Sequence, residues 1–320
     1  MIENQKIPIS VVIPTYGRER VLLEAIDQLL QQVPAAAEIL VIDQTVEHEQ
    51  STDLRLGKWH SKDEIRWIRL DQPSQPAALN IGLQKATQPF VLFLDDDIRI
   101  DQEFMEAHYN AFDSEGIWGV AGQVLQPGEE EDEKCIYRLK PGLLVDVDFA
   151  FRTGRKRYVQ NGMSGNLCVR RKRALQIGGF DENFTPPVSY RFDNEFCKRL
   201  CRAGGKIVFE PKARIYHLRA ERGGTRTNSN HMTSMSPEHG VGDYYFALRV
   251  GLSSETLYYI LRRPFREVRT KFHLCHPWWI PVKLVGEFRA LILALLLLFR
   301  GPRYLHVSGL NIQYRDGKEK

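Results

Sequence analysis

The sequence contains few cysteines, and their positions argue against a disulfide framework and a paired zinc site. Five cysteines, an odd number, occur in 320 residues, and no pair has the spacing of a structural zinc site. This usage is typical of reduced thiols, so we expect a cytoplasmic protein. Cys197 and Cys201 lie on an expected helix. They are either a metal-binding pair or two small buried residues, and we favour the second interpretation.

Long apolar segments are also absent. Residues 1–8 contain no apolar signal core, so nothing there directs the chain to export. Residues 290–299 form a run of ten apolar residues, whereas a membrane-spanning helix needs ~20. Lys283, Glu287 and Arg289 precede this run, so we expect no transmembrane helix. No Gly-x-Gly-x-x-Gly follows the first expected strand, which argues against a dinucleotide-dependent dehydrogenase.

Charge is distributed unevenly along the chain. The formal net charge is +4, but residues 244–320 carry +8 and the preceding residues carry −4. A basic tail on a slightly acidic body predicts a negatively charged partner surface for the tail. Aromatic residues such as Trp278 and Trp279 lie among its basic residues. The tail is therefore either an interfacial helix, peripheral on the inner face of a membrane, or a helix that packs on protein.

Apolar runs and helical patterns alternate along the first half of the chain. Expected strands span residues 9–13, 38–42, 65–70, 90–94, 118–124, 206–210 and 214–217, and expected helices span 21–30, 77–86, 101–112, 170–177 and 193–203. Alternation of this kind predicts an α/β protein with a parallel, doubly wound sheet. We place one domain at residues 1–235 and a basic, aromatic-rich helical region at residues 236–320.

Three consecutive carboxylates follow the most apolar of these strands. Residues 90–94 are all apolar, as in a strand buried on both faces, and Asp95, Asp96 and Asp97 come directly after them. Open α/β sheets bind ligands at the carboxyl ends of their strands. Adjacent carboxylates repel one another, and a cation such as Mg²⁺ or Mn²⁺ removes that cost. The alternatives are a metal–diphosphate site and a solvated acidic loop, and we favour the metal site.

The order of motifs along the chain resembles one family of enzymes. Pro14-Thr15-Tyr16, Asp43, the aspartates, residues 178–182, residues 192–195 and His217 follow one another as in the inverting glycosyltransferases of family 2. The resemblance covers residues 9–226. It implies the GT-A fold, a Rossmann-like doubly wound mixed sheet. It also implies metal-dependent transfer of a sugar from a nucleotide diphosphate sugar, in polysaccharide or glycan biosynthesis.

The same resemblance assigns roles to individual residues. The nucleotide-sugar-binding residues implied are Pro14, Thr15, Tyr16, Asp43, Gln44, Asn80, Asp95, Asp96 and Arg226. The metal ligands implied are Asp95, Asp97 and His217, with Mg²⁺ or Mn²⁺ as the cofactor. Asp193 corresponds to the catalytic base, which takes the proton of the attacking sugar hydroxyl. The sequence departs from the family pattern at Gln44, where an acid or Asn is usual, at Leu79, where Arg is common, and at Phe192, which replaces Glu.

Two other functions stay open, the second of them because of the departures at Gln44 and Phe192. One is a phosphatase of the haloacid dehalogenase type, in which Asp-x-Asp follows an apolar strand, although Ile98 fits that motif poorly. The other is a non-catalytic nucleotide-sugar-binding protein. For the transferase, the implied partners are a UDP-, dTDP- or GDP-sugar donor and a saccharide or lipid-linked acceptor. Peripheral membrane contact and a homo-oligomer are left open, and we expect no nucleic-acid partner.

Overall fold

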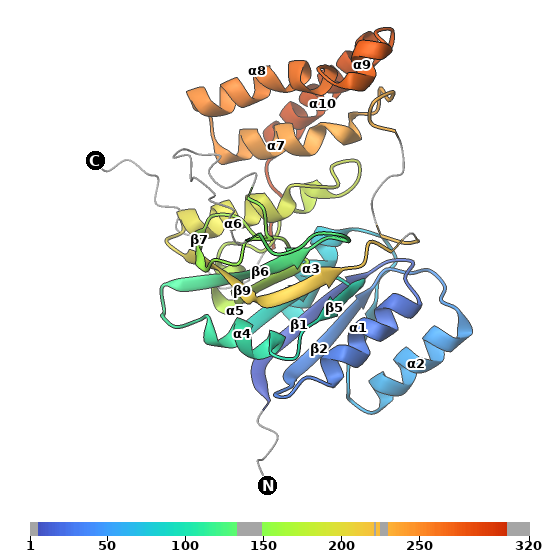
Figure 1. Ribbon diagram of the computed structural model, residues 1–320, viewed down its shortest axis with the longest axis vertical. Coiled ribbons are helices and arrows are strands. Elements are labelled where there is room, and N and C mark those ends of the chain that lie inside the picture. The colour runs from blue at the N-terminus through green and yellow to red at the C-terminus, as the bar shows by residue number, and fades with distance from the viewer. Residues whose placement is uncertain (1–5, 133–148, 221, 225–229, 306–320) are drawn as a thin grey trace.

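The computed structural model describes residues 6–132, 149–220, 222–224 and 230–305 (Figure 1). The strands are β1 Ile7–Thr15, β2 Ala36–Asp43, β3 Arg66–Arg69, β4 Phe90–Leu94, β5 Ile98–Ile100, β6 Ile117–Leu125, β7 Arg157–Val159, β8 Asn166–Arg170 and β9 Lys206–His217. The α-helices are α1 Arg20–Leu30, α2 Gln50–Ser61, α3 Gln75–Lys85, α4 Phe104–Asn110, α5 Arg171–Gln176, α6 Phe192–Arg202, α7 Val241–Val250, α8 Ser254–Val268, α9 Lys271–Cys275 and α10 Trp279–Arg300.

The strands of the described residues form one mixed sheet. Its order is β3-β2-β1-β4-β8-β6-β9-β5, and β7 pairs with β9. Strands β1 to β4 are parallel, as their alternation with helices predicts. β8 runs antiparallel to both β4 and β6. The mixed sheet that the family resemblance implies is therefore confirmed. The entirely parallel sheet that the alternation alone predicts is wrong for the second half of the chain, where β8 is antiparallel to its neighbours.

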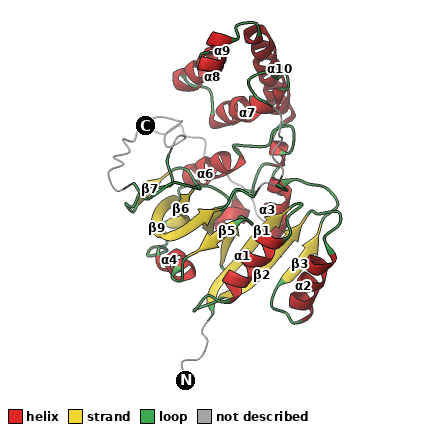
Figure 2. Cartoon of the chain, turned by 45° about the vertical axis from the view of Figure 1, so that its right-hand side comes forward, coloured by secondary structure: helices red, strands yellow, loops and turns green. Residues whose placement is uncertain are grey.

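The sheet is covered on both faces, and alternate residues of each central strand face the two cores. In β4, Val91 and Phe93 belong to the core that includes α6 and α7, whereas Leu92 and Leu94 belong to the core beneath α1 and α4. Figure 2 shows α1 and α2 on the near side of the sheet. The prediction that residues 90–94 form a strand buried on both faces is confirmed.

The C-terminal helices extend the first of these cores. Tyr244 and Phe246 of α7 pack in one apolar cluster with Val12 and Phe93 of the sheet. Figure 1 shows α7 between α6 and the outer helices α8, α9 and α10. None of the helices described combines the length and apolar character that crossing a membrane requires. A helical C-terminal region is thus confirmed, while the boundary at residue 235 stays a prediction.

After α10, the chain returns to Gly178 and Gly179, the glycine pair of the motif at residues 178–182. The amide of Leu305 donates to the carbonyl of Gly178 at 2.8 Å, and the amide of Glu182 donates to the carbonyl of Arg303 at 3.0 Å. Gly178 has φ +83°, and a Cβ there would lie 2.9 Å from the Cβ of Tyr304. Glycine is required because the backbone is left-handed and a second chain segment lies against it.

Candidate active site

A cleft of about 1460 Å³ lies at the carboxyl edge of the parallel strands. Because β1, β2 and β4 are parallel, the segments that follow them meet at this edge. The predicted site residues that line the cleft are Pro14, Thr15, Tyr16, Gln44, Asp95, Asp96, Asp97, Asp193 and His217. Asp43 and Asn80 do not line it, and Arg226 lies outside the described residues. Most of the predicted residues therefore share one cavity.

The topology of the sheet places His217 beside the aspartates. Strand β5 pairs antiparallel with the end of β9, and Ile98 lies opposite His217. Nε2 of His217 is 3.3 Å from Oδ1 of Asp97 and 3.7 Å from Oδ2 of Asp95. One ligand atom from each of the three residues lies within 4.8 Å of the others. Residues 120 positions apart in the sequence thus form one cluster of potential metal ligands.

This donor set fits a hard divalent cation. Carboxylate oxygens are the ligands that Mg²⁺ and Mn²⁺ prefer, and neutral imidazole is a common metal ligand. Gly165 leaves room for the Asp95 carboxylate, because a Cβ there would lie 2.1 Å from its Oδ2. The amide of Asp95 donates to the carbonyl of Gly165 at 3.2 Å, which fixes the backbone at this point. Asp95, Asp97 and His217 could therefore hold the cation.

Asp96 differs from the aspartates beside it. Its Oδ2 accepts a hydrogen bond of 2.6 Å from the hydroxyl of Thr15, which connects the ends of β4 and β1. Burial, followed by smaller and partly opposing contributions from its neighbours, raises the pKa of Asp96 to about 7. Oδ1 of Asp96 lies 3.5 Å from Nε of Arg18. Asp96 therefore joins the loop that follows β1 to the acidic cluster.

Arg18 is a cleft residue that the sequence reasoning missed. Its Nη2 lies 3.2 Å from Oδ2 of Asp97, and its Nη1 donates to the carbonyl of Ala220 at 2.8 Å and to that of Arg222. The amide of Gly224 also donates to the carbonyl of Tyr16 at 2.8 Å. These contacts hold Ala220, Arg222 and Gly224 against the loop that follows β1. The signal in the sequence was Gly17-Arg18, a Gly-Arg pair shortly after the first strand.

Asp193 lines the same cleft and lies in the first turn of α6. Its Oδ1 accepts from the amide of Asn194 at 2.8 Å, and burial raises the pKa of its carboxyl. Arg191, which caps this helix, has φ +75° and also lines the cleft. Glu195 does not line the cleft, and its carboxylate pairs with Arg199 at 2.7 Å. Of these two carboxylates, that of Asp193 therefore lines the cleft and that of Glu195 does not.

Asp43 and Gln44, both expected to bind the nucleotide sugar, are placed differently. Asp43 is fully buried and accepts hydrogen bonds of 2.9 Å from the amide of Thr45, the indole of Trp67 and the ring of His48. Gln44 lines the cleft, and its Oε1 accepts from the amide of Ser74. A direct contact of Asp43 with the nucleotide stays a prediction, and its observed contacts shape the loop that presents Gln44.

His48 gives this loop a testable pH dependence. Burial lowers the pKa of His48, but hydrogen bonds with Asp43 and Glu19 outweigh it, so the pKa is raised above 6.5. Its stabilising contribution is therefore complete below pH 6.5 and is lost as the pH rises through the raised value. We expect His48→Gln to cost about 2 kcal/mol of unfolding free energy at pH 5.5 and less at pH 9. Urea denaturation at both pH values measures this difference.

The matched control for this prediction is His60→Gln. His60 is exposed at the end of α2, so its substitution should change the unfolding free energy by a similar small amount at both pH values. If His48→Gln lowers the unfolding free energy as much at pH 9 as at pH 5.5, the charged pair of His48 with Asp43 contributes nothing to stability.

Asn80 lies beneath the cleft rather than in it. Its side-chain amide donates to the carbonyl of Phe180 at 2.9 Å, and its Oδ1 accepts from the amide of Phe180 at 2.8 Å. Its Nδ2 also donates to the carboxylate of Glu182 at 3.0 Å. These bonds attach α3 to the segment that carries the glycine pair. Nucleotide contact by Asn80 stays a prediction that its described contacts do not support.

Known proteins resemble this chain in sequence and in fold. A curated relative, an uncharacterized glycosyltransferase of Rickettsia felis, is 35% identical over 108 residues, which cover 31% of this chain and 17% of the relative. GalNAc-T7 with UDP, GalNAc and Mn²⁺ superposes with a TM-score of 0.62, 15% identity, and coverage of 82% of this chain and 52% of that one. Mannosyltransferase PcManGT from Pyrobaculum calidifontis, in complex with GDP-Man and Mn²⁺, superposes with a TM-score of 0.54 and 16% identity. This superposition covers 91% of this chain and 76% of that one.

These likenesses carry different weight. At such low identities, the two solved structures show the fold alone, and they confirm the GT-A type of α/β fold. The chain spans less than a third of the length of the curated relatives it matches. The family model described as glycosyl transferase family 2 matches residues 10–176, which is more than half of the chain. The chain therefore belongs to glycosyl transferase family 2.

Proposed function

We propose that this chain transfers a sugar from a nucleotide diphosphate sugar to a hydroxyl of a saccharide or lipid-linked acceptor, with a divalent cation and with inversion. One observation carries the proposal: a metal-ligand cluster of Asp95, Asp97 and His217 and a half-buried carboxylate, Asp193, line the same cleft. A diphosphate needs the first and an acceptor hydroxyl needs the second. The family membership of residues 10–176 supports this assignment.

The donor is proposed to lie along the edge formed by β1, β2 and β4. Pro14, Thr15, Tyr16 and Gln44 present backbone and side-chain hydrogen-bonding groups there. When bound at the acidic cluster, the cation neutralises charge on the diphosphate. Arg18, beside Asp97, adds a guanidinium that can pair with phosphate oxygens. The cleft thus offers positive charge where the leaving group develops negative charge.

Asp193 performs the proton transfer in this mechanism. Its carboxylate accepts the proton of the acceptor hydroxyl as the oxygen attacks the anomeric carbon. The new C–O bond forms on the face opposite the diphosphate, and the bond to the diphosphate oxygen breaks with its electron pair. A single displacement inverts the anomeric configuration. Burial raises the pKa of Asp193, which makes its carboxylate a stronger base than an exposed aspartate.

Two alternatives give different assay results. The family match favours a transferase over the phosphatase that the sequence left open. A phosphatase would release inorganic phosphate without sugar transfer. A non-catalytic binding protein would bind the nucleotide sugar without turnover in the presence of any acceptor. The first experiment is a thermal-shift panel of UDP-, dTDP- and GDP-sugars with and without Mn²⁺. We expect stabilisation by one nucleotide class that depends on the cation, and its absence throughout contradicts the proposal.

The metal assignment predicts a specific loss of affinity. Asp97→Asn keeps the shape of the side chain but removes one negative charge from the ligand set. We expect the Mn²⁺-dependent affinity for the nucleotide to fall at least about tenfold, or ~1.4 kcal/mol. Isothermal titration of the selected nucleotide diphosphate with and without Mn²⁺ measures it. Asp101→Asn is the matched control, because Asp101 does not line the cleft. Equal Mn²⁺-dependent affinity in the two variants would remove Asp97 from the metal site.

A further inference from the structure

The outer C-terminal helices have their polar and apolar faces reversed. In α10, the buried face carries Lys283 and Glu287 beside small residues such as Ala290, whereas Phe288 and Phe299 are 63% and 86% exposed. A helix on the surface of a protein in water normally buries its large apolar side chains instead. The sequence of α10 therefore fits an environment that is apolar on the outside.

Helix α8 shows the same reversal. It buries Arg263, which is 3% exposed, while Leu257, Leu261 and Phe265 are 54%, 60% and 73% exposed. These three positions are four residues apart and so lie along one side of the helix. Figures 1 and 2 place α8, α9 and α10 beyond α7, at the end of the molecule farthest from β2. Two helices of this outermost layer thus present apolar stripes.

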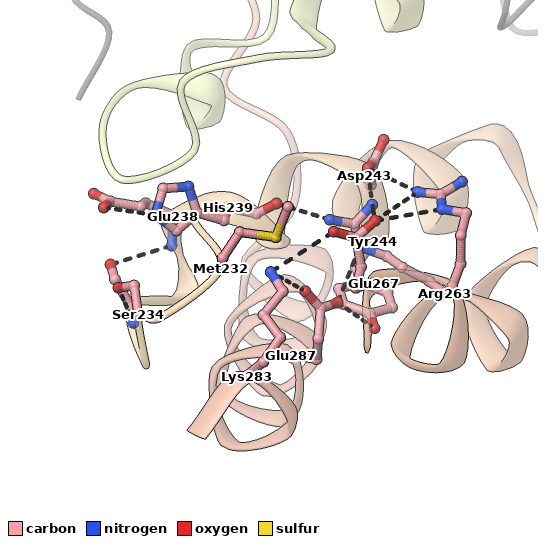
Figure 3. Close-up of polar contacts among 12 residues, drawn as sticks. Met232, Ser234, Glu238, His239, Asp243, Tyr244, Arg263, Glu267, Lys283 and Glu287 are labelled. Carbon is pink, nitrogen blue, oxygen red and sulfur yellow. Dashed lines mark hydrogen bonds and ion pairs between the residues drawn. The ribbon is translucent and has the colours of Figure 1, made fainter. Parts of the chain in front are cut away.

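Buried ion pairs prevent these helices from turning their apolar faces inward. Glu287 accepts hydrogen bonds from Arg263 at 3.0 Å and Tyr244 at 2.9 Å, and it pairs with Lys283 at 3.0 Å (Figure 3). Rotating α8 or α10 would break this network and leave buried charges without partners, which is strongly destabilising. The outward position of the apolar residues is therefore built into the packing of the layer.

The charges around the apolar stripes have one sign. Between Ser254 and Arg300, the charged side chains in exposed positions are all cationic: Arg262, Arg266, Arg269, Lys271, Arg289 and Arg300. Glu255 and Glu267 are half-buried, and Glu287 is buried. A second copy of this chain would bring cations against cations. A surface that is negatively charged outside and apolar beneath matches both the charges and the stripes.

We propose that the exposed faces of α8 and α10 bind an anionic lipid bilayer, with both helices lying in its interface. The aromatic and aliphatic side chains enter the acyl boundary, and the arginines and lysine remain at the level of the lipid phosphates. Composition alone predicts a tail at the membrane interface. The reversed faces of α8 and α10, held in place by buried ion pairs, identify which surface of the tail makes the contact. This binding does not depend on the transfer reaction, so the two proposals fail separately.

Vesicle co-sedimentation with the full chain tests the surface. We expect binding to vesicles that contain phosphatidylglycerol, at least tenfold weaker binding to pure phosphatidylcholine, and weakening in 0.5 M NaCl. The triple variant Phe265→Ser, Phe288→Ser, Phe299→Ser should bind at least tenfold more weakly. Replacing Arg262, Lys271 and Arg300 by Gln should weaken binding roughly hundredfold, since each cation near an anionic surface contributes ~1 kcal/mol.

The control replaces exposed apolar residues elsewhere. Val46 and Leu54 are 86% and 66% exposed outside the C-terminal helices, so Val46→Ser with Leu54→Ser should leave vesicle binding unchanged. Far-UV circular dichroism confirms that each variant is folded. Equal binding by the phenylalanine variant and the control overturns the proposal, as does equal binding to both lipids. Loss of a homodimer in the phenylalanine variant, measured by sedimentation velocity without a loss of vesicle binding, would assign the surface to a second copy instead.

Discussion

Replacing Asp193 by Asn should lower the rate of sugar transfer by about 10²–10⁴, the usual contribution of a general base. The substitution keeps the size of the side chain and its place in the first turn of α6, but an amide cannot accept the proton of the acceptor hydroxyl. Nucleotide affinity should remain near that of the wild type, because Asp193 does not belong to the metal cluster. Steady-state kinetics together with nucleotide titration separate the two effects.

The pH dependence gives the same assignment a second readout. Burial raises the pKa of Asp193, and only the deprotonated form acts as a base. The transfer rate should therefore rise with pH through this raised pKa, and Asp193→Asn should remove that limb of the profile. Asp27→Asn, on the exposed side of α1, is the control and should leave rate and profile unchanged. Transfer by Asp193→Asn at a rate comparable to the control would place the base elsewhere.

The sequence was most informative at strand β4, where the local pattern of residues alone indicates how the strand is buried. The apolar run before Asp95 predicts a strand buried on both faces, and the structure has Leu92 and Phe93 in opposite cores. The end of such a strand in an open α/β sheet is also where ligands bind. The position of the acidic cluster therefore followed from local pattern and one general rule. The nearby histidine was found only through the family resemblance.

Other features depend on pairing that no local pattern encodes. Strand β5 is three residues long, and β8, Asn166–Arg170, does not alternate with a helix before it, so both were missed. Residues 206–210 and 214–217 were expected as two strands. They form one strand, β9, because the register shift opposite Gly122 and Gln123 accommodates the residues between them. Tertiary contacts decide such cases more than local propensity does.

Residue roles carried over from the family were least secure where side chains are fully buried. Asp43 is bonded to Thr45, His48 and Trp67, and Asn80 is bonded to the backbone of Phe180. Neither partner set can be inferred from the motif alone, because each includes a residue distant in the sequence, Trp67 for Asp43 and Phe180 for Asn80. Buried polar side chains need partners, so such a residue can serve packing as well as ligand binding.

The second large effect is expected at Asp243, which connects the helical layer to the cleft. Asp243 is 4% exposed, and its carboxylate pairs with Arg263 (Figure 3). It also pairs with Arg191 at 2.7 Å and accepts a hydrogen bond of 3.0 Å from the hydroxyl of Tyr259. Asp243→Asn leaves two guanidinium groups without this counter-charge, one of them buried. We expect the unfolding free energy to fall by about 3–5 kcal/mol, measured by urea denaturation at pH 7.

The pH dependence of this loss, and a matched exposed ion pair, test whether the charge of Asp243 is responsible for the loss of stability. Burial raises the pKa of Asp243, but Arg263 and Arg191 outweigh it and lower the pKa below 3.8. The contribution of Asp243 to stability is present above pH 3.8 and is lost as the pH falls through its lowered pKa. The difference in unfolding free energy between wild type and variant should therefore narrow only at acidic pH. Asp27→Asn breaks an exposed pair with Arg55 at 2.8 Å and should cost less than ~1 kcal/mol. Similar costs for the two variants would mean that the buried network stabilises the helical layer no more than a surface ion pair does.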